Sequence, residues 1–175
     1  MNDNIVSTPK FVAFIIAFAM LAALLMFDDD GFIPAIDYVN TVFHEGGHFV
    51  FQVFGDTMGL WGGTLGQLLP PIICAVVFWR QKSLVSVSVA LLWLFENFFD
   101  IATYMATARS EGPIVWGVFG WGYHDWWVIL SRWRALQYDT TLATIARVMG
   151  WIGLSSTLVF ITYFWWQCKK LYARR

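Results

Sequence analysis

The sequence centres on an HExxH pattern, Thr41-Val42-Phe43-His44-Glu45-Gly46-Gly47-His48, set in a run of Phe and Val. Residues four apart lie on the same face of an α-helix, so the imidazoles of His44 and His48 can reach a single metal ion. Glu45 lies about 100° further round the helix, where its carboxylate can accept the proton of a water molecule on that metal. The pattern therefore predicts a helix that carries two metal ligands and a general base.

Polar side chains around this pattern gather on one side of the predicted helix. They fall within an arc of roughly 140° on a helical wheel: Asp37, Asn40, Thr41, His44, Glu45, His48 and Gln52. The opposite arc holds small or apolar residues: Val42, Phe43, Gly46, Phe49, Val50, Val53 and Phe54. A metal site accounts for this concentration of polar groups, and a polar seam that packs against another helix is the alternative explanation.

The composition is that of an integral membrane protein. Of the 175 residues, 58% are hydrophobic and 13% are charged, whereas a soluble protein has about 45–50% apolar residues. A net charge of −1 provides no basic surface for nucleic acid. Cys74 and Cys168 match no disulfide or zinc-binding spacing. We therefore expect a single domain over 1–175 that is embedded in the lipid bilayer and binds no nucleic acid.

The distribution of apolar residues predicts an all-α fold, a polytopic membrane helix bundle. About five membrane segments are expected: 11–27, 34–55, 66–82, 84–107 and 148–166. We also expect an amphipathic interfacial helix at 126–138 and a glycine-rich connection at 55–63. Pro70 and Pro71 should kink or break the third segment, because proline lacks the backbone N–H that a helix interior requires.

Basic residues near the segment ends predict the orientation. More lysines and arginines follow the third and last segments than lie at the opposite ends of these helices, and cytoplasmic loops carry such an excess. This distribution predicts a multi-pass protein of the cell membrane with a cytoplasmic C-terminus, and it leaves the side of the N-terminus open.

A catalytic zinc site usually has a third protein ligand besides the two histidines. Asp100 is the first candidate, because an ionised carboxylate within a membrane segment costs roughly 2.5–3.5 kcal/mol and a bound cation would neutralise it. His124, in a Trp-rich loop, is the alternative, and Glu96 and Asp125 are further candidates. Asp100 could instead pair with Arg147 at the start of the last segment.

Four other residues are candidates for the surroundings of the metal and substrate. Glu96 lies four residues before Asp100, on the same helical face, and Asn97 lies beside it. Gly62 and Gly63 follow the motif helix and could line a substrate groove. Other roles are open: Glu96 could be protonated and hydrogen-bonded, and Asn97 could join two helices. The glycines could simply permit close helix packing.

The motif and its setting resemble the site-2 protease family of intramembrane zinc metalloproteases. In that family, HExxH lies within a membrane-embedded helix, often with Gly before the second His, as Gly47 stands here. The resemblance implies a catalytic core of three helices, here about 34–107, and an Asp from a later core helix as third ligand, here Asp100. The chain lacks the family's usual Leu-Asp-Gly sequence, because residues 100–101 read Asp-Ile. It therefore resembles a minimal or divergent member.

The expected activity is hydrolysis of peptide bonds in membrane-protein substrates. One Zn²⁺ per chain on His44, His48 and Asp100 would polarise the scissile carbonyl and lower the pKa of its bound water towards about 7. Glu45 would then serve as the general base. A membrane protein that binds or transports metal without proteolysis is the alternative, and a structural membrane subunit is a third hypothesis.

Overall fold

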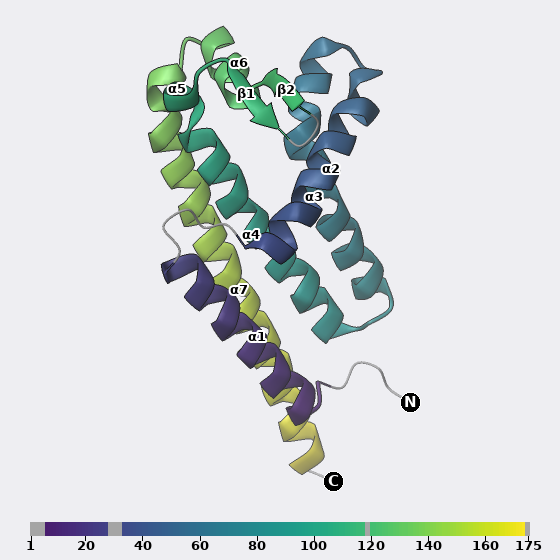
Figure 1. Ribbon diagram of the computed structural model, residues 1–175. Coiled ribbons are helices and arrows are strands. Elements are labelled where there is room, and N and C mark those ends of the chain that lie inside the picture. Colours follow the sequence, from purple (N-terminus) through teal and green to yellow (C-terminus); the bar gives the residue numbers. More distant parts are fainter. Residues whose placement is uncertain (1–5, 28–32, 118–119, 174–175) are drawn as a thin grey trace.

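The computed structural model describes residues 6–27, 33–117 and 120–173, and it confirms the all-α class (Figure 1). The elements in chain order are α1 (Thr8–Phe27), α2 (Pro34–Gln52), α3 (Asp56–Arg80), α4 (Leu84–Ala106), α5 (Ala108–Glu111), β1 (Ile114–Gly117), β2 (Gly120–Tyr123), α6 (Asp125–Arg132), the 3-10 helix η1 (Leu136–Tyr138) and α7 (Asp139–Ala173). The two strands pair antiparallel within the Trp-rich loop that precedes His124.

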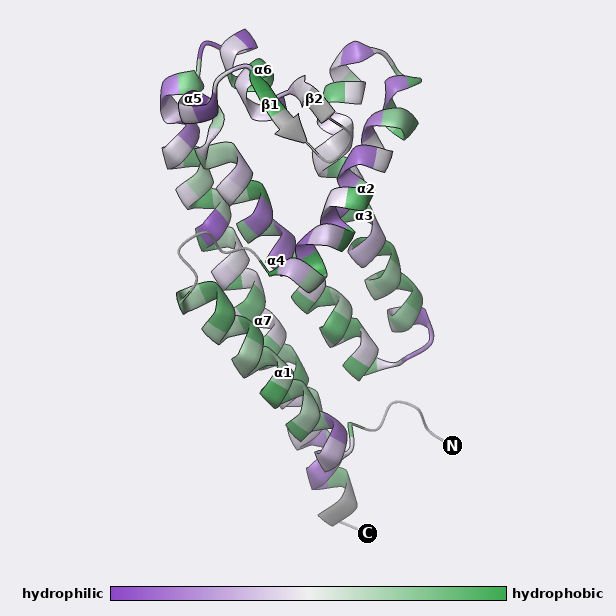
Figure 2. Cartoon of the chain, in the orientation of Figure 1, coloured by the Kyte–Doolittle hydropathy of each residue, from purple (hydrophilic) through white to green (hydrophobic). Residues whose placement is uncertain are grey.

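Four helical stretches of the described chain are long and apolar enough to cross a membrane. They are Thr8–Phe27, Asp56–Arg80, Leu84–Glu111 and Leu136–Leu171. One of the five predicted segments, 34–55, is not among them. It corresponds to α2, and the polar residues of its inner face lower its average hydropathy. Figure 2 shows that hydrophobic residues dominate α1, whereas hydrophilic residues gather on α2 and near α5 and α6.

Helices α2 and α3 form an antiparallel pair with very close backbones. A Cβ atom at Gly47 would overlap the carbonyl oxygen of Gly62, and a Cβ atom at Gly66 would overlap the carbonyl oxygen of Phe43. Glycine at these three positions is therefore a condition for the contact. The predicted glycine-rich connection at 55–63 is wrong in this respect, since all but its first residue form the opening turns of α3.

Pro70 and Pro71 lie inside α3, which runs without a break from Asp56 to Arg80. The predicted break at these prolines is therefore not confirmed. Helices packed in a membrane tolerate proline where neighbouring helices and side chains compensate for the freed backbone groups. Here α3 lies between α2 and α4 and contacts both.

Helices α4 and α7 pack together along their length and hold the apolar core. Phe95 and Phe99 of α4 rest on Gly153 and Gly150 of α7, where any Cβ atom would meet the aromatic rings. Helix α1 lies along the C-terminal half of α7, where Phe11 stacks on Trp165 with ring centroids 4.4 Å apart. Figure 1 shows the start of α1 and the end of α7 at one end of the molecule, and α5, β1, β2 and α6 at the other.

The predicted interfacial helix at 126–138 is shorter in the structure. Helix α6 ends at Arg132 and is followed by η1, and α7 then begins at Asp139, nine residues before the predicted start of the last segment. The apolar face of α6, with Ile129 and Leu130 buried, packs against α3 and α4. This packing fixes the first residue of α6, Asp125, above the end of α4.

Candidate metal centre

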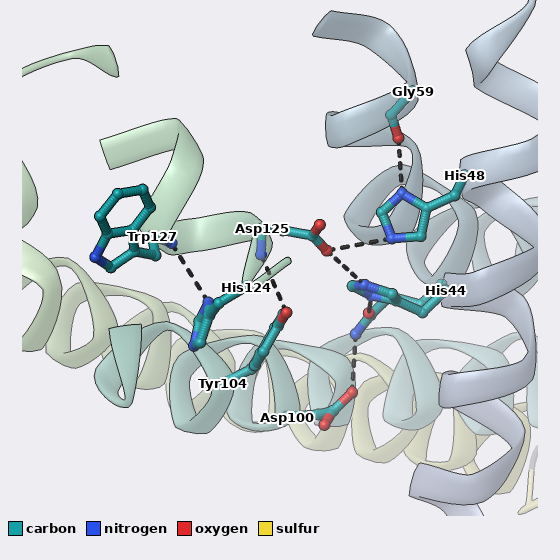
Figure 3. Close-up of polar contacts among 9 residues, drawn as sticks. His44, His48, Gly59, Asp100, Tyr104, His124, Asp125 and Trp127 are labelled. Carbon is teal, nitrogen blue, oxygen red and sulfur yellow. Dashed lines mark hydrogen bonds and ion pairs between the residues drawn. The ribbon is translucent and has the colours of Figure 1, made fainter. Parts of the chain in front are cut away.

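His44 and His48 of α2 converge on one carboxylate, that of Asp125 at the start of α6 (Figure 3). The Oδ2 atom of Asp125 lies 2.9 Å from Nε2 of His44 and 3.2 Å from Nε2 of His48. The three ligand atoms lie within 4.8 Å of one another and could hold a metal ion. Ligand atoms of a tetrahedral zinc ion with bonds of about 2.0–2.1 Å are about 3.3 Å apart. The spacing is therefore close to that of a metal centre.

The partners of the other ring nitrogens fix the tautomer of each histidine. Nδ1 of His48 lies 2.7 Å from the carbonyl oxygen of Gly59, which can only accept, so this nitrogen carries the hydrogen. Nδ1 of His44 lies 2.6 Å from Oε1 of Gln67. The amide nitrogen of Gln67 donates to the carboxylate of Asp100 at 2.9 Å, which turns the amide oxygen towards His44. Nδ1 of His44 therefore donates as well.

Both Nε2 atoms are thus left with a lone pair that points at a carboxylate oxygen. In their neutral form His44 and His48 bring no hydrogen to this contact, so three electron-rich atoms face one another. Such an arrangement is stable only when a proton or a metal cation lies among them. Imidazole nitrogens with a second hydrogen bond to a carbonyl group are the usual ligands of a protein-bound zinc ion.

Asp125 is held in its ionised form by the same contacts. Burial alone would raise the pKa of this carboxyl group, but hydrogen bonds from His44 and His48, which form when Nε2 of the imidazole is protonated, outweigh burial and hold the pKa below its usual value. The side chain of Asp125 is only 9% exposed, whereas that of His48 is 27% exposed. The cluster is therefore anionic on its inner side and accessible on the side of His48.

The backbone of Asp125 is held by Tyr104 of α4. The first amides of a helix have no partner within the helix, and the N–H of Asp125 instead donates to the hydroxyl oxygen of Tyr104 at 3.1 Å. An acidic residue in the first turn also interacts favourably with the helix dipole. The position of Asp125 therefore depends on the contact between the start of α6 and Tyr104 of α4.

His124, the predicted alternative ligand, points away from the cluster and is fully buried. Its Nδ1 accepts from the N–H of Trp127 at 3.3 Å and so caps α6, and its Nε2 lies 3.1 Å from Oγ1 of Thr107. Its ring stacks on Tyr104 with centroids 4.2 Å apart. Burial lowers the pKa of this imidazole. Both nitrogens are engaged, so His124 supports α6 and is no ligand in this arrangement.

Asp100, the predicted third ligand, makes no direct contact with the histidines, because the side chain of Gln67 lies between it and His44. Its carboxylate accepts from Gln67 and reaches His44 only through that amide. Asp125, one of the further candidates of the sequence analysis, lies beside the two histidines instead. The predicted alternative pairing of Asp100 with Arg147 is absent from the described contacts, since the guanidinium group of Arg147 donates to Thr103 at 3.2 Å.

Glu45, the predicted general base, is half-buried next to the cluster. Its charge acts on the imidazole of His48, and its carboxylate forms no hydrogen bond or ion pair with any of the residues that the structure describes. Glu45 is therefore free to accept a proton.

Glu96 belongs to a separate polar network between α2 and α4, and Asn97 is buried next to it on α4. Nδ2 of Asn40 donates to Glu96 at 3.0 Å and lies 3.4 Å from Oδ1 of Asp37. Nε1 of Trp93 donates to Oδ1 of Asn40 at 2.8 Å. The side chain of Asn97 donates to the backbone carbonyl of Trp93. Asn40, Glu96 and Trp93 therefore join α2 to α4, whereas the bond of Asn97 stays within α4. None of these bonds reaches the metal cluster.

Gly62 and Gly63 serve packing in the structure. A Cβ atom at Gly62 would crowd the backbone of Gly47, and a Cβ atom at Gly63 would overlap the imidazole ring of His44. Gly63 thereby makes the space that the first ligand occupies. Gly59, which the sequence did not single out, provides the backbone acceptor for His48.

Comparison with protein-family models, curated proteins and solved structures finds no match to this chain. The metal centre is therefore interpreted from its own geometry.

Proposed function

We propose that the chain is an intramembrane zinc metalloprotease that hydrolyses peptide bonds of membrane-protein substrates. This is the activity that its resemblance to the site-2 protease family implies. The observation that carries the proposal is the convergence of two imidazole lone pairs and one carboxylate beside the uncommitted acid Glu45. Two nitrogen ligands, one oxygen ligand and an open fourth position suit a catalytic zinc ion.

Each residue of the centre has a distinct role in this proposal. His44, His48 and Asp125 would hold the ion, which would supply Lewis-acid activation of the scissile carbonyl and of a water molecule. Glu45 accepts the proton of that water and passes it to the leaving amine. Gln67 keeps His44 in the tautomer that leaves Nε2 free. Asp125 takes the place that the family resemblance assigns to Asp100.

The membrane setting follows from the exposed apolar surface. On the outer face of α2, the side chains of Phe49 and Val53 are 74% and 78% exposed. In water such a surface would be unfavourable, whereas lipid covers it at no cost. We therefore include α2 as a fifth membrane segment, in a protein of the cell membrane with its C-terminus in the cytoplasm. A substrate segment has to unwind before cleavage, because helical carbonyls are already hydrogen-bonded.

The substitution Glu45→Gln tests the function. The purified wild-type protein and the variant are incubated in detergent with fluorescently labelled β-casein, an unfolded polypeptide, and zinc is measured by elemental analysis. We expect close to one zinc per chain in both proteins and cleavage by the wild type alone, because glutamine cannot accept the proton.

The outcomes separate the hypotheses. Cleavage that persists in Glu45→Gln would contradict the protease proposal. Zinc at one equivalent without any cleavage by the wild type would favour the metal-binding or transport alternative. Absence of metal from the wild type under zinc-replete conditions would favour a structural role for the polar side of α2.

A further inference from the structure

The hydroxyl group of Tyr104 is a hydrogen-bond donor without an acceptor at the edge of the metal centre. Its oxygen accepts from the N–H of Asp125 at 3.1 Å. A phenol can also donate one hydrogen bond, yet no acceptor for this hydrogen occurs among residues 6–27, 33–117 and 120–173. The hydrogen is therefore available to a ligand.

The ring of Tyr104 is fixed from two sides. The ring of His124 stacks on it at 4.2 Å with an interplanar angle of 15°. The imidazole of His44 meets it at 5.8 Å and 78°, an edge contact. Figure 3 shows the hydroxyl directed at the backbone of Asp125, next to the carboxylate that closes the cluster. Such a preorganised donor loses little freedom when a ligand binds.

We propose that Tyr104 is a catalytic residue that donates a hydrogen bond to the carbonyl oxygen of the scissile peptide group. This inference rests on the proposed function and adds a second electrophile to the centre. Donors aimed at an oxygen that gains negative charge stabilise the transition state of acyl transfer, and loss of one costs roughly 10²–10³-fold in kcat.

The bonds and protons of the step balance without consumption of Tyr104. The water oxygen forms a bond to the carbonyl carbon, the π-electron pair moves to the carbonyl oxygen, and Glu45 takes the water proton. The electron pair on the oxygen then re-forms the carbonyl bond, and the C–N bond breaks with its electron pair left on the nitrogen. The proton passes from Glu45 to this amine nitrogen. Tyr104 keeps its proton and strengthens its hydrogen bond while the oxygen is negative.

A purely structural role for Tyr104, as the anchor of Asp125, makes a different prediction. Loss of an anchor would weaken the hold on the metal, whereas loss of a donor would weaken the hold on an oxygen ligand beside the metal. The substitution Tyr104→Phe distinguishes the role of Tyr104 as an anchor of Asp125 from its role as a donor to the oxygen ligand. Tyr123→Phe is the matched control, because Tyr123 is two residues from Asp125 in sequence but 73% exposed.

The test uses the full-length protein loaded with Co²⁺ and titrated with acetohydroxamate, whose binding changes the visible absorption of the cobalt ion. For Tyr104→Phe we expect about tenfold weaker binding of acetohydroxamate to the cobalt-loaded protein, the effect of one lost hydrogen bond. The loss of cobalt affinity, caused by the lost bond to the N–H of Asp125, should be smaller than that. Tyr123→Phe should match the wild type in both. With labelled β-casein, Tyr104→Phe should lower kcat and leave KM unchanged.

Several results would overturn the inference. Equal acetohydroxamate affinity in Tyr104→Phe and wild type, or a weaker cobalt site with unchanged acetohydroxamate affinity, would leave Tyr104 as an anchor only. A wild type that binds cobalt, whose acetohydroxamate binding depends on Tyr104, but that cleaves nothing would refute the protease proposal. Tyr104 would then remain a hydrogen-bond donor to a ligand of the metal. A wild type that binds no cobalt would refute the metal centre and the donor together.

Discussion

His44 and His48 differ in the group that holds each imidazole. A backbone carbonyl, that of Gly59, accepts from His48 and is present whatever the side chain at that position. His44 depends on the amide of Gln67, whose orientation depends in turn on Asp100. Side-chain substitutions near the centre should therefore act mainly through His44.

The roles of Asp100 and Asp125 can be told apart by zinc affinity. Asp100→Ala removes the acceptor that orients Gln67, and such outer partners of a metal ligand contribute roughly 10–100-fold in affinity. Asp125→Ala removes a ligand and should cost more than Asp100→Ala. Competition with a fluorescent zinc chelator measures both constants. A larger loss in Asp100→Ala would show that Asp100, as first predicted, is the ligand.

At the scale of the elements, the contact between α2 and α3 determines the geometry of the histidines. Backbone approaches backbone where Gly47 meets Gly62 and Gly66, and the ring of His44 fills the space above Gly63. No larger residue fits at these points unless one helix moves.

Gly63→Ala should damage the metal centre. The new methyl group would overlap the imidazole of His44, and we expect zinc affinity to fall by about tenfold or more, as for loss of an outer partner. Gly46→Ala is the matched control. Its methyl group would meet nothing within 4 Å, and alanine favours the helix by about 1 kcal/mol over glycine. Zinc titration measures the affinity of both variants. Equal affinities in Gly63→Ala and Gly46→Ala would show that the space next to His44 does not affect zinc binding.

The buried network between α2 and α4 should matter for stability. Asn40→Leu deprives Glu96 and Trp93 of their partner, and a buried polar group left without one costs about 1–3 kcal/mol. The thermal unfolding midpoint in detergent should fall accordingly. Glu96→Gln keeps an acceptor for Asn40 and should unfold near the wild-type temperature. A midpoint that drops equally in both variants would show that the carboxyl group of Glu96 contributes as much to stability as the amide of Asn40.

At the scale of the whole molecule, the metal centre joins two distant parts of the chain. His44 and Asp125 are 81 residues apart in sequence, and they meet because α6 docks on α4 while α2 packs on α3. An ion held by both α2 and α6 would therefore stabilise this end of the molecule.

Zinc should raise the unfolding temperature of the wild type. A ligand that binds only the folded state at one hundred times its Kd adds about 2.7 kcal/mol. Tryptophan fluorescence during heating, with zinc or with EDTA, measures the shift. Asp125→Ala should show a much smaller shift at the same zinc concentration. An identical zinc-dependent shift in Asp125→Ala would place the ion elsewhere.

Features governed by local sequence were predictable. Apolar runs marked α1, α4 and much of α7, and the spacing of four residues placed His44 and His48 on one face of α2, because helical periodicity is a property of the chain itself. A polar seam and a metal site were weighed as alternatives, and α2 carries both a polar seam and two residues of the group that could hold a metal ion. Its first half binds Glu96 and its second half binds Asp125.

The identity of the third ligand was decided by tertiary structure alone. Asp100 and Asp125 are equally capable of binding a metal, and nothing in the spacing of either from His48 tells which carboxylate comes within reach. The distance depends on how Tyr104 and the buried face of α6 orient the start of that helix. The sequence therefore determined which side chains could bind an ion, and the packing of α6 on α3 and α4 determined which carboxylate lies beside the two histidines.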